Sequence, residues 1–433
     1  MKQTARRIFR ETLAAIDIPA SVERQLLRSG SRIRVGDDRI DLRAFSRILA
    51  IAYGKASFAM AQGLTAVLAP EYRPEGILVV PAAIDGQLAG WETFFGGHPV
   101  PNAMSFAAGR AILRHLARCD EHTLIFFLIS GGGSSLVEQP LDPAITLEDF
   151  QKLHSALVSC GASIEEVNTV RKHLSATKGG RLSAAAPRSM KLTLAISDVP
   201  PGQESALASG PTLPDPTTID DAERIVREYK LLDRFPPSLR TLFADRAILE
   251  SPKEGDPVFA RSRFAVLLGQ QELMHAAHRC CETAGYVCVC DNSTDDWPIE
   301  KAADHLLAQL IAQRRSYPGR PVAVLSDGEL SSPVTGDGTG GRNSAFVLAC
   351  VSKIAGRKIA VLSAGTDGID GNSPAAGAVA DGETWSRAHA AGFDVVDFLR
   401  RSDAYGFFDL LEDTIVTGPT GNNLRDLRIL LLG

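Results

Sequence analysis

Leu124-Ile125-Phe126-Phe127-Leu128-Ile129 is an unbroken apolar run that stops at Ser130-Gly131-Gly132-Gly133-Ser134-Ser135. A short run without polar alternation predicts a strand covered on both faces, as in a parallel sheet. Glycines directly after such a strand let the backbone approach a ligand closely. This stretch therefore predicts an α/β fold whose strand ends carry the functional groups.

The same pattern recurs along the chain. Apolar runs that stop at small or polar residues lie at 48–53, 77–80, 192–196, 322–325 and 359–362, and a last run covers 427–432. Helical periodicity separates them, for example over 105–118, 148–160 and 271–284. Strands alternating with helices predict a doubly wound α/β architecture with a parallel sheet.

Composition limits the class of partner. The chain has 433 residues, a net charge of −5 and no long basic stripe, which argues against nucleic acid as a partner. No apolar run is long enough to span a membrane. The N-terminus lacks the pattern of a signal peptide, and residues 6–16 read as an amphipathic surface helix.

The seven cysteines point to a reducing compartment. Cys280, Cys281, Cys288 and Cys290 lie close in sequence, but no CxxC pair occurs, so zinc ligation is disfavoured. Residues 286–290 read as a strand with both of its thiols on one face. We therefore predict buried, reduced thiols and a cytoplasmic protein.

Two domain boundaries are suggested by proline and glycine. Prolines gather between 210 and 260, and Tyr317-Pro318-Gly319-Arg320-Pro321 marks a second break. These breaks divide the chain into an N-terminal part, 1–240, and a C-terminal part, 320–433. The segment 241–319, with a predicted strand and helix, connects the two parts and is assigned to neither domain.

The first candidate site combines the glycine loop 130–135 with a lysine. Three successive glycines can point backbone N–H groups into one concavity that suits phosphate, and the serines add hydroxyl donors. A tight strand-to-helix turn explains the loop equally well. Lys55 follows Gly54 at the end of another strand, before a helix, where a cation is favourable only beside an anion. Read alone, Lys55 is better explained as a solvated lysine.

Further cations stand beside other glycines. Residues 336–341 hold four glycines and lead into Arg342-Asn343, the pattern of a flexible loop that delivers an arginine to an anion. Lys178 lies in the basic segment 172–181, which ends in glycines. That segment could hold a carboxylate or phosphate, or it could simply be a helix C-terminus with favourable cations.

Acidic side chains follow several strands. They are Asp198, Glu329, Asp367 and Asp370, and carboxylates at strand ends suit Mg²⁺ binding or proton abstraction. Each could instead cap a turn. Cations for phosphate charge, acids for Mg²⁺ and little covalent chemistry form the inventory of phosphoryl transfer.

Nine segments together resemble the class II glycerate 2-kinases, also called the MOFRL or glycerate kinase/tartrate-degradation family. They run in family order over nearly the whole chain: 52–56, 97–102, 129–135, 172–181, 196–200, 209–216, 340–343, 365–371 and 417–423. Two departures stand out. Asn422 occupies a position where the family has threonine, and 326–331 is poorer in threonine, with Leu330 in place of a hydroxyl.

The resemblance implies a larger N-terminal Rossmann-like three-layer domain and a smaller C-terminal α/β domain, with a cleft between them. It implies phosphorylation of D-glycerate at O2 with ATP and Mg²⁺, with Lys55 and Arg342 as the catalytic cations and Asp198 beside them. The expected phosphate or nucleotide contacts are Ser130, Gly131, Gly132, Gly133, Ser134, Ser135, Lys178, Asn343 and Asn423. The expected metal ligands come from Asp198, Glu329, Asp367 and Asp370.

Two other classes of function remain. Members of the family have been named hydroxypyruvate reductases, but no Gly-x-Gly-x-x-Gly follows an early strand here, as NAD(P)H binding would require. The scaffold could also serve a non-catalytic nucleotide or sugar-acid binding protein. The sequence leaves open a homodimer and the exact hydroxy-acid range.

Overall fold

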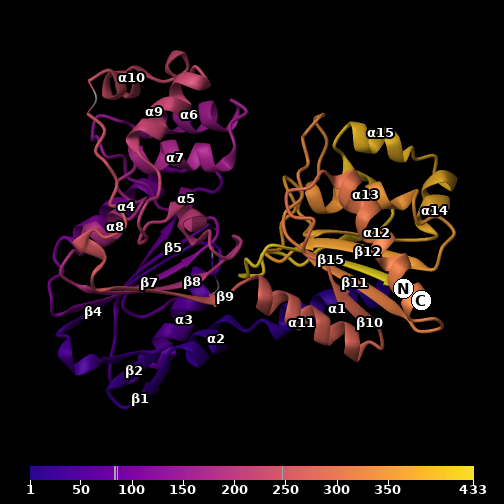
Figure 1. Cartoon of the computed structure of the whole chain (residues 1–433), viewed down its shortest axis with the longest axis horizontal. Coiled ribbons are helices and arrows are strands. Elements are labelled where there is room, and N and C mark those ends of the chain that lie inside the picture. Colours follow the sequence, from indigo (N-terminus) through magenta and orange to yellow (C-terminus); the bar gives the residue numbers. More distant parts are fainter. Residues whose placement is uncertain (82–83, 85, 246) are drawn as a thin grey trace. The chain divides into compact units, whose positions relative to one another are not determined.

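The chain forms two compact α/β units, which confirms the predicted fold class (Figure 1). The computed structural model describes residues 1–433 except 82, 83, 85 and 246. The N-terminal unit is Ile18–Leu267, and the C-terminal unit joins Met1–Asp17 to Leu268–Gly433. Among the described residues, no helix combines the length and apolarity that crossing a bilayer requires.

The N-terminal unit is built on a six-stranded sheet with the order β6-β5-β4-β7-β8-β9. Its strands are β4 (Arg47–Tyr53), β5 (Glu75–Val80), β6 (Trp91–Phe95), β7 (Thr123–Ser130), β8 (Met190–Ile196) and β9 (Ser262–Leu268). All pairs from β6 to β8 are parallel, as the apolar runs predicted. A small antiparallel sheet precedes it: β1 (Leu27–Ser29), β2 (Arg32–Val35) and β3 (Asp38–Asp41).

Helices complete the N-terminal unit. They are α2 (Ile18–Gln25), α3 (Ser57–Leu68), α4 (Ala103–Leu116), α5 (Gly133–Leu136), α6 (Leu147–Val158), α7 (Ile164–Leu174), α8 (Arg181–Ala184), α9 (Ile219–Glu228) and α10 (Pro237–Ala244), with 3-10 turns at Leu42–Ala44, Glu204–Ser209, Leu231–Asp233 and Pro257–Phe259. Strand side chains alternate between the two faces. Ile51 and Phe127 face the α4 side, and α3 packs against the same strands. The three-layer prediction holds for this unit.

A separate helical layer lies beyond this sheet. Helices α6, α7, α9 and α10 share a core that includes Phe150, Leu153, Val170, Ile225 and Leu239 (Figure 1). The prolines of 210–260 therefore connect helices inside the N-terminal unit and do not end it. The border falls at Leu267, whereas the sequence analysis placed breaks at 240 and 320.

The order in which strands are added to the sheet reverses at its centre. From β4 the chain proceeds outward to β5 and β6, then returns to the other side of β4 for β7 and β8. The carboxyl ends of β4 and β7 are therefore neighbours at the point where the strand order reverses. In open α/β sheets, this switch point is where ligands bind.

One strand of this sheet contains a buried lysine that donates to a backbone carbonyl, with no hydrogen bond to a carboxylate among the described residues. Lys191 of β8 is fully buried, and its Nζ donates to the Ala186 carbonyl at 2.9 Å. Burial, with help from nearby Arg261, lowers the pKa of Lys191 to about 8. The charged form is thus disfavoured in the folded state.

This lysine predicts a pH-dependent stability. Between pH 8 and 10.5 the unfolded chain binds the Lys191 proton and the folded chain does not, so stability rises with pH. We expect Lys191→Met to remove about 1–2 kcal/mol of the rise in unfolding free energy between pH 7 and 9.5. Urea unfolding at both pH values measures it, with the exposed Lys152→Met as control. An unchanged slope in Lys191→Met would contradict the prediction.

The C-terminal unit has a mixed sheet with the order β10-β11-β15-β12-β13-β14. Its strands are β10 (Val287–Cys290), β11 (Val322–Asp327), β12 (Ile359–Gly365), β13 (Gly377–Asp381), β14 (Thr414–Ile415) and β15 (Asp426–Leu432). Its helices are α1 (Lys2–Ala15), α11 (Gln270–Thr283), α12 (Ile299–Ser316), α13 (Arg342–Val351), α14 (Thr384–Ala390), α15 (Val395–Arg400) and α16 (Ala404–Leu410). Helices α12 and α13 cover one face, and α1 and α11 the other (Figure 1).

The prediction of a parallel sheet is wrong for this unit. Only β10 and β11 are directly parallel neighbours, and β15 lies antiparallel between β11 and β12. The apolar runs correctly indicated strands covered on both faces. Burial of both faces does not determine the direction of a strand, because an antiparallel strand inserted between two parallel strands is buried equally well.

The first helix belongs to the C-terminal unit, although the sequence analysis placed 1–240 together. Helix α1 buries Ile8 and Phe9 and packs on α11, β12, β13 and β15. Lys2 Nζ contacts Asp413 Oδ2 at 2.9 Å, and Arg6 donates to the Thr414 carbonyl at 2.7 Å. The amphipathic pattern predicted the helix but not the surface that it covers.

The cysteines are all free thiols. Residues 287–290 form the expected strand, but the prediction of burial fails for Cys290, which is exposed, and only Cys281 and Cys350 are fully buried. The reason is that β10 is the edge strand of its sheet.

Candidate functional site

The carboxyl ends of β4 and β7 are joined by direct hydrogen bonds at the switch point. The Lys55 N–H donates to the Gly131 carbonyl at 3.0 Å, and the Ala56 N–H donates to Ser130 Oγ at 3.0 Å. Gly54 has φ +121°, and a β-carbon there would lie 2.2 Å from Ser130 Oγ. Glycine is therefore required for Lys55 to sit beside the loop 130–135.

The glycine loop has little room for side chains. Gly132 has φ +81° and precedes α5, and a β-carbon at Gly132 would lie 3.4 Å from Lys55 Cγ and 3.1 Å from His98 Cδ2. At Gly133 a β-carbon would lie 2.8 Å from Ala208 Cβ. Lys55 and His98 thus flank the loop. His98 was not among the predicted site residues, although its segment belonged to the resemblance.

Serine hydroxyls extend the site toward a strained turn. Ser134 Oγ lies 2.9 Å from Ser209 Oγ, which donates to Asn168 Oδ1 at 3.3 Å. Ala208 and Ser209 have φ +49° and +61°, a conformation that non-glycine residues rarely adopt and that clusters at functional sites. Asn168 was missed because a single amide inside a helix gives no sequence signal.

Asp198 lies at the same edge of the sheet. In the parallel pairing of β7 with β8, Ser130 is opposite Ile196, and Asp198 comes two residues later. Its side chain is partly exposed. The structure therefore groups Lys55, the glycine loop and Asp198 at one edge of the N-terminal unit.

Lys178, predicted to contact phosphate, has a partner inside the N-terminal unit. Its Nζ is 2.5 Å from Glu138 Oε2, and both side chains are almost completely buried. Glu138 also accepts from Ser175 Oγ and from the Gln139 N–H. Burial lowers the pKa of Lys178 even though Glu138 opposes the shift. Residue type and glycine neighbours could not reveal this internal partner.

Other basic side chains of 172–181 also have partners inside the N-terminal unit. Lys172 Nζ lies 3.2 Å from Asp215 Oδ1, and His173 Nε2 lies 3.0 Å from Glu250 Oε1. The segment is therefore joined to 215–250 by polar side-chain contacts.

The buried pair predicts an asymmetry between single and double substitutions. Lys178→Met leaves the Glu138 carboxylate buried without its cation, and we expect a loss of about 3–5 kcal/mol in unfolding free energy. Glu138→Gln combined with Lys178→Met removes both charges and should cost clearly less. Urea unfolding measures the loss of unfolding free energy in the single and the double variant. Equal losses would show that the cost does not come from leaving the Glu138 carboxylate without its cation.

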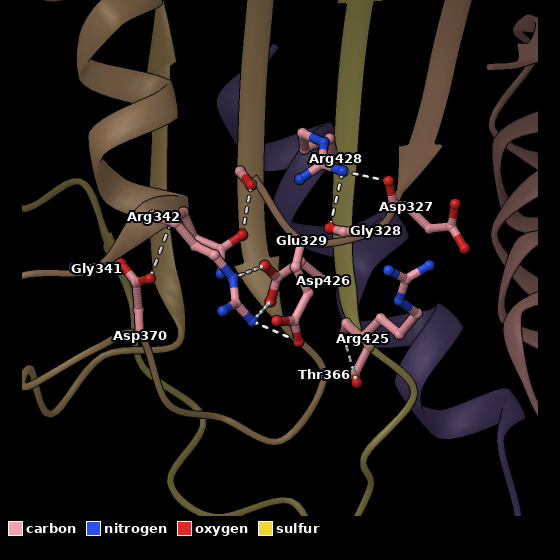
Figure 2. Close-up of polar contacts among 12 residues, drawn as sticks. Asp327, Gly328, Glu329, Gly341, Arg342, Thr366, Asp370, Arg425, Asp426 and Arg428 are labelled. Atoms are coloured by element: carbon pink, nitrogen blue, oxygen red, sulfur yellow. Dashed lines mark hydrogen bonds and ion pairs between the residues drawn. The ribbon is translucent and has the colours of Figure 1, made fainter. Parts of the chain in front are cut away.

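The second polar group lies in the C-terminal unit, where β11 and β12 end (Figure 2). Because β15 is antiparallel to both, its first residue, Asp426, lies at this edge, opposite Gly365. Arg342, the first residue of α13, donates from Nε to Asp426 Oδ2 at 2.5 Å. Its Nη2 lies 2.8 Å from Glu329 Oε1.

The two carboxylates around Arg342 keep it charged. Burial disfavours the cation, but Asp426 and Glu329 raise the pKa of Arg342 above its ordinary value. Burial likewise opposes ionisation of Asp426, yet Arg342 holds the pKa of that carboxyl below its usual range. Together, the side chains of Arg342, Asp426 and Glu329 carry a net charge of about −1 at neutral pH. An additional anion would therefore require a change in these pairs or an added cation.

Asp370, predicted as a metal ligand, accepts hydrogen bonds at the start of a helix. Oδ1 accepts from the Asn343 N–H at 2.9 Å, and Oδ2 accepts from Gly341, from the Ser344 N–H and from Ser344 Oγ. These donors open α13. Burial raises the pKa of Asp370 despite the hydrogen bonds. Asn343 is also buried, and its Oδ1 accepts from Ser363 Oγ at 2.6 Å.

The loop before Arg342 is pinned to the turn after α15, contrary to the expectation of flexibility. Gly338 N–H donates to the Arg401 carbonyl at 3.0 Å, and the Tyr405 N–H donates to the Thr339 carbonyl at 2.9 Å. A β-carbon at Gly336 would lie 2.5 Å from the Arg401 carbonyl oxygen. Glycine serves close packing here.

The segment 417–423 is fastened to the end of β12. Thr420 Oγ1 donates to the Thr366 carbonyl at 2.5 Å, and the Leu424 N–H donates to Thr366 Oγ1 at 2.8 Å. Asn423 is buried in this segment, and Asp367 begins the facing turn, where its Oδ1 accepts from the Ile369 N–H. Leu330, which stands where the family pattern has a hydroxyl, is buried in the core of the C-terminal unit.

A deeper layer of charges supports this edge and was missed in the sequence. Arg425 Nη2 contacts both oxygens of Asp295 at 2.6 Å, and Arg428 donates to the Asp327 and Gly328 carbonyls (Figure 2). Arg428 is fully buried, and burial lowers its pKa to about 10. Burial also raises the pKa of Asp327. Charged residues within the apolar last strand were the available signal.

The structure divides the predicted metal ligands between its two units. Within residues 1–81, 84, 86–245 and 247–433, no group of three or more His, Cys, Asp or Glu side chains is arranged to hold a metal ion. Asp198 belongs to the N-terminal unit, and Glu329 and Asp367 belong to the C-terminal unit.

A glycine loop and a lysine at the ends of neighbouring parallel strands form the arrangement by which α/β proteins commonly bind anions. A family described as a domain of unknown function (DUF4147) matches residues 4–244, and the MOFRL family matches residues 322–426. The chain belongs to this DUF4147–MOFRL family, the glycerate 2-kinase family that its motifs resemble.

Individual relatives agree over most of the length. A D-glycerate 2-kinase of Thermotoga maritima is 33% identical, over 89% of this chain and 91% of the relative. A protein of Agrobacterium vitis that carries a provisional hydroxypyruvate reductase name is 34% identical, over 100% of this chain and 94% of its own. The crystal structure of a glycerate kinase from Thermotoga maritima superposes with a TM-score of 0.82, at 31% identity, covering 100% of this chain and 99% of that one.

Proposed function

We propose that this protein transfers the terminal phosphate of ATP to D-glycerate, giving 2-phosphoglycerate. The observation that carries the proposal is the junction of Lys55 with the glycine loop 130–135 at the switch point. Backbone N–H groups and one lysine at that position suit a phosphate or carboxylate. The glycerate kinase relatives supply the reaction to which this geometry belongs.

Each group has a proposed task in this reaction. The glycine loop and Lys55 bind and neutralise anionic oxygens, and Arg342 stabilises charge on the transferring phosphoryl group. Asp198, at the end of β8, removes the proton from the hydroxyl that is phosphorylated. Free thiols at all seven cysteines support a reducing compartment such as the cytoplasm.

Mg²⁺ fits this reaction through a small number of carboxylates. The ion takes one or two carboxylates together with waters and phosphate oxygens. Asp370 is committed to helix α13 and Asp426 to Arg342. Asp198, Glu329 and Asp367 are partly exposed and carry the oxygens that suit Mg²⁺. When bound, the ion neutralises charge on the nucleotide phosphates.

Alanine substitutions separate these roles. We expect one or two of Asp198→Ala, Glu329→Ala and Asp367→Ala to raise the Mg²⁺ concentration needed for half-maximal rate by about tenfold or more. Asp370→Ala should instead lower thermal stability, since it removes the cap of α13. Unchanged Mg²⁺ dependence in the first three variants would place the metal elsewhere.

Product analysis tests the reaction itself. Purified protein is incubated with ATP, Mg²⁺ and D-glycerate, and ³¹P and ¹³C NMR identify the product and the phosphorylated hydroxyl. We expect 2-phosphoglycerate and ADP in equal amounts. A parallel incubation with hydroxypyruvate and NADH or NADPH tests the reductase. Robust nicotinamide oxidation without ATP-dependent product would overturn the kinase proposal.

A further inference from the structure

Arg342 contacts two carboxylates that differ sharply in their surroundings. The Asp426 side chain is 4% exposed and contacts Arg342 through Nε at 2.5 Å and Nη2 at 3.5 Å. The Glu329 side chain is 44% exposed and contacts Arg342 through Nη2, at 2.8 Å. Asp426 therefore spans Nε and Nη2 of the planar guanidinium, and Glu329 shares Nη2 with it (Figure 2).

The Asp426 contact is built into the fold. Its backbone pairs with Gly365 in the sheet, and the Asn343 side chain gives the carboxylate a further hydrogen bond. Separating this pair would leave a buried charge without its partner, at a cost of several kcal/mol. Asp426 and Arg342 should thus stay together throughout turnover.

The ion pair between Glu329 and Arg342 is exposed enough for another anion to replace Glu329. Partly exposed ion pairs contribute about 0–1 kcal/mol, because water competes for both groups. An anion with two oxygens can bind a pair of N–H groups of a guanidinium at once. A phosphate that arrives at Nη2 competes with Glu329, whereas Asp426 keeps its shorter contact with Nε.

We propose that Asp426 is the positioning residue for Arg342, and that Glu329 is a counter-ion that an incoming phosphate displaces. The proposal deepens the kinase function and rests on it. It assigns the two carboxylates opposite roles, one fixed throughout and one exchanged on binding. It also explains how a cluster with net negative charge admits an anion.

Kinetics tests the positioning role through its dependence on Arg342. We expect Asp426→Asn to lower kcat by about 10²-fold, the cost of a misplaced catalytic group. In an Arg342→Ala background the same substitution should change kcat less than about threefold, since residues acting as a unit are not additive. Asp413→Asn is the matched control, because Asp413 is a buried acid paired with Arg387 in the same unit. It should alter stability but not kcat. Equal losses from Asp426→Asn in both backgrounds would overturn positioning.

Two measurements do not depend on catalysis. The Arg342 Nε–H resonance, identified by its loss in Arg342→Lys, should shift or broaden in Asp426→Asn and persist in Glu329→Gln. Inorganic triphosphate without Mg²⁺, measured by calorimetry, should bind about two- to fivefold tighter to Glu329→Gln than to wild type, the equivalent of one exposed ion pair. An unmoved resonance in Asp426→Asn rejects positioning, and no gain in affinity rejects exchange. An inactive wild type with both results as expected would reject only the kinase function.

Discussion

Lys55→Ala is expected to lower kcat for D-glycerate phosphorylation by about 10³–10⁵-fold, the usual cost of losing a cation aimed at transferring phosphate. The fold should remain intact, because Lys55 follows β4 and contributes no side chain to the core. Its backbone contact with Gly131 also survives the substitution. The measurement is kcat at saturating ATP and glycerate.

Lys152→Ala controls for the loss of a lysine in the same unit. That side chain is exposed and pairs with Glu148 one helical turn away, so its removal should leave kcat unchanged. Circular dichroism verifies the fold of both variants. If well-folded Lys55→Ala kept a wild-type rate, Lys55 would have no part in the chemistry.

Arg342→Ala should cause a loss of similar size, about 10³–10⁵-fold in kcat. Arg342→Lys should recover only part of it, because a point charge cannot replace the separate Nε and Nη2 contacts to Asp426 and Glu329. If Arg342 and Lys55 act in the same step, the double alanine variant should be little slower than either single one.

Arg387→Ala is the control for Arg342, since Arg387 also pairs with a buried acid in the same unit. It should reduce stability and leave kcat unchanged. Additive losses in the Lys55 and Arg342 double variant would show that the two cations act in separate steps. A wild-type rate in Arg342→Ala would remove it from the mechanism.

Much of the fold was predictable because buried strands appear in the sequence as short apolar runs that stop at small or polar residues. The runs at 48–53, 124–129 and 192–196 correspond to β4, β7 and β8. Strand direction in the C-terminal unit was not predictable, because a run records burial and not its neighbour's orientation. The surface beneath α1 was hidden for a related reason, since an amphipathic helix does not specify its partner.

The candidate site also contains features that the sequence predicted and features that it did not. Lys55 and the glycine loop were predicted as neighbours in function because both follow apolar strands beside glycines, and the switch point explains why they are neighbours in space. The internal contacts of Lys178 and Asp370 were not predictable, because residue type and position are the same for a ligand contact, a buried ion pair and a helix cap. Asp426 was missed because an acid at the start of an apolar strand resembles a boundary residue.

Helix α1 has a consequence for synthesis on the ribosome. It leaves the exit tunnel before the whole N-terminal unit, yet its partners β12, β13 and β15 are among the last segments made. The N-terminal unit can complete its own sheet while Ile8 and Phe9 still lack their cover. Nascent chains stalled near residue 300 should therefore hold a finished N-terminal unit and an unprotected first helix, open to protease and chaperone until β15 emerges.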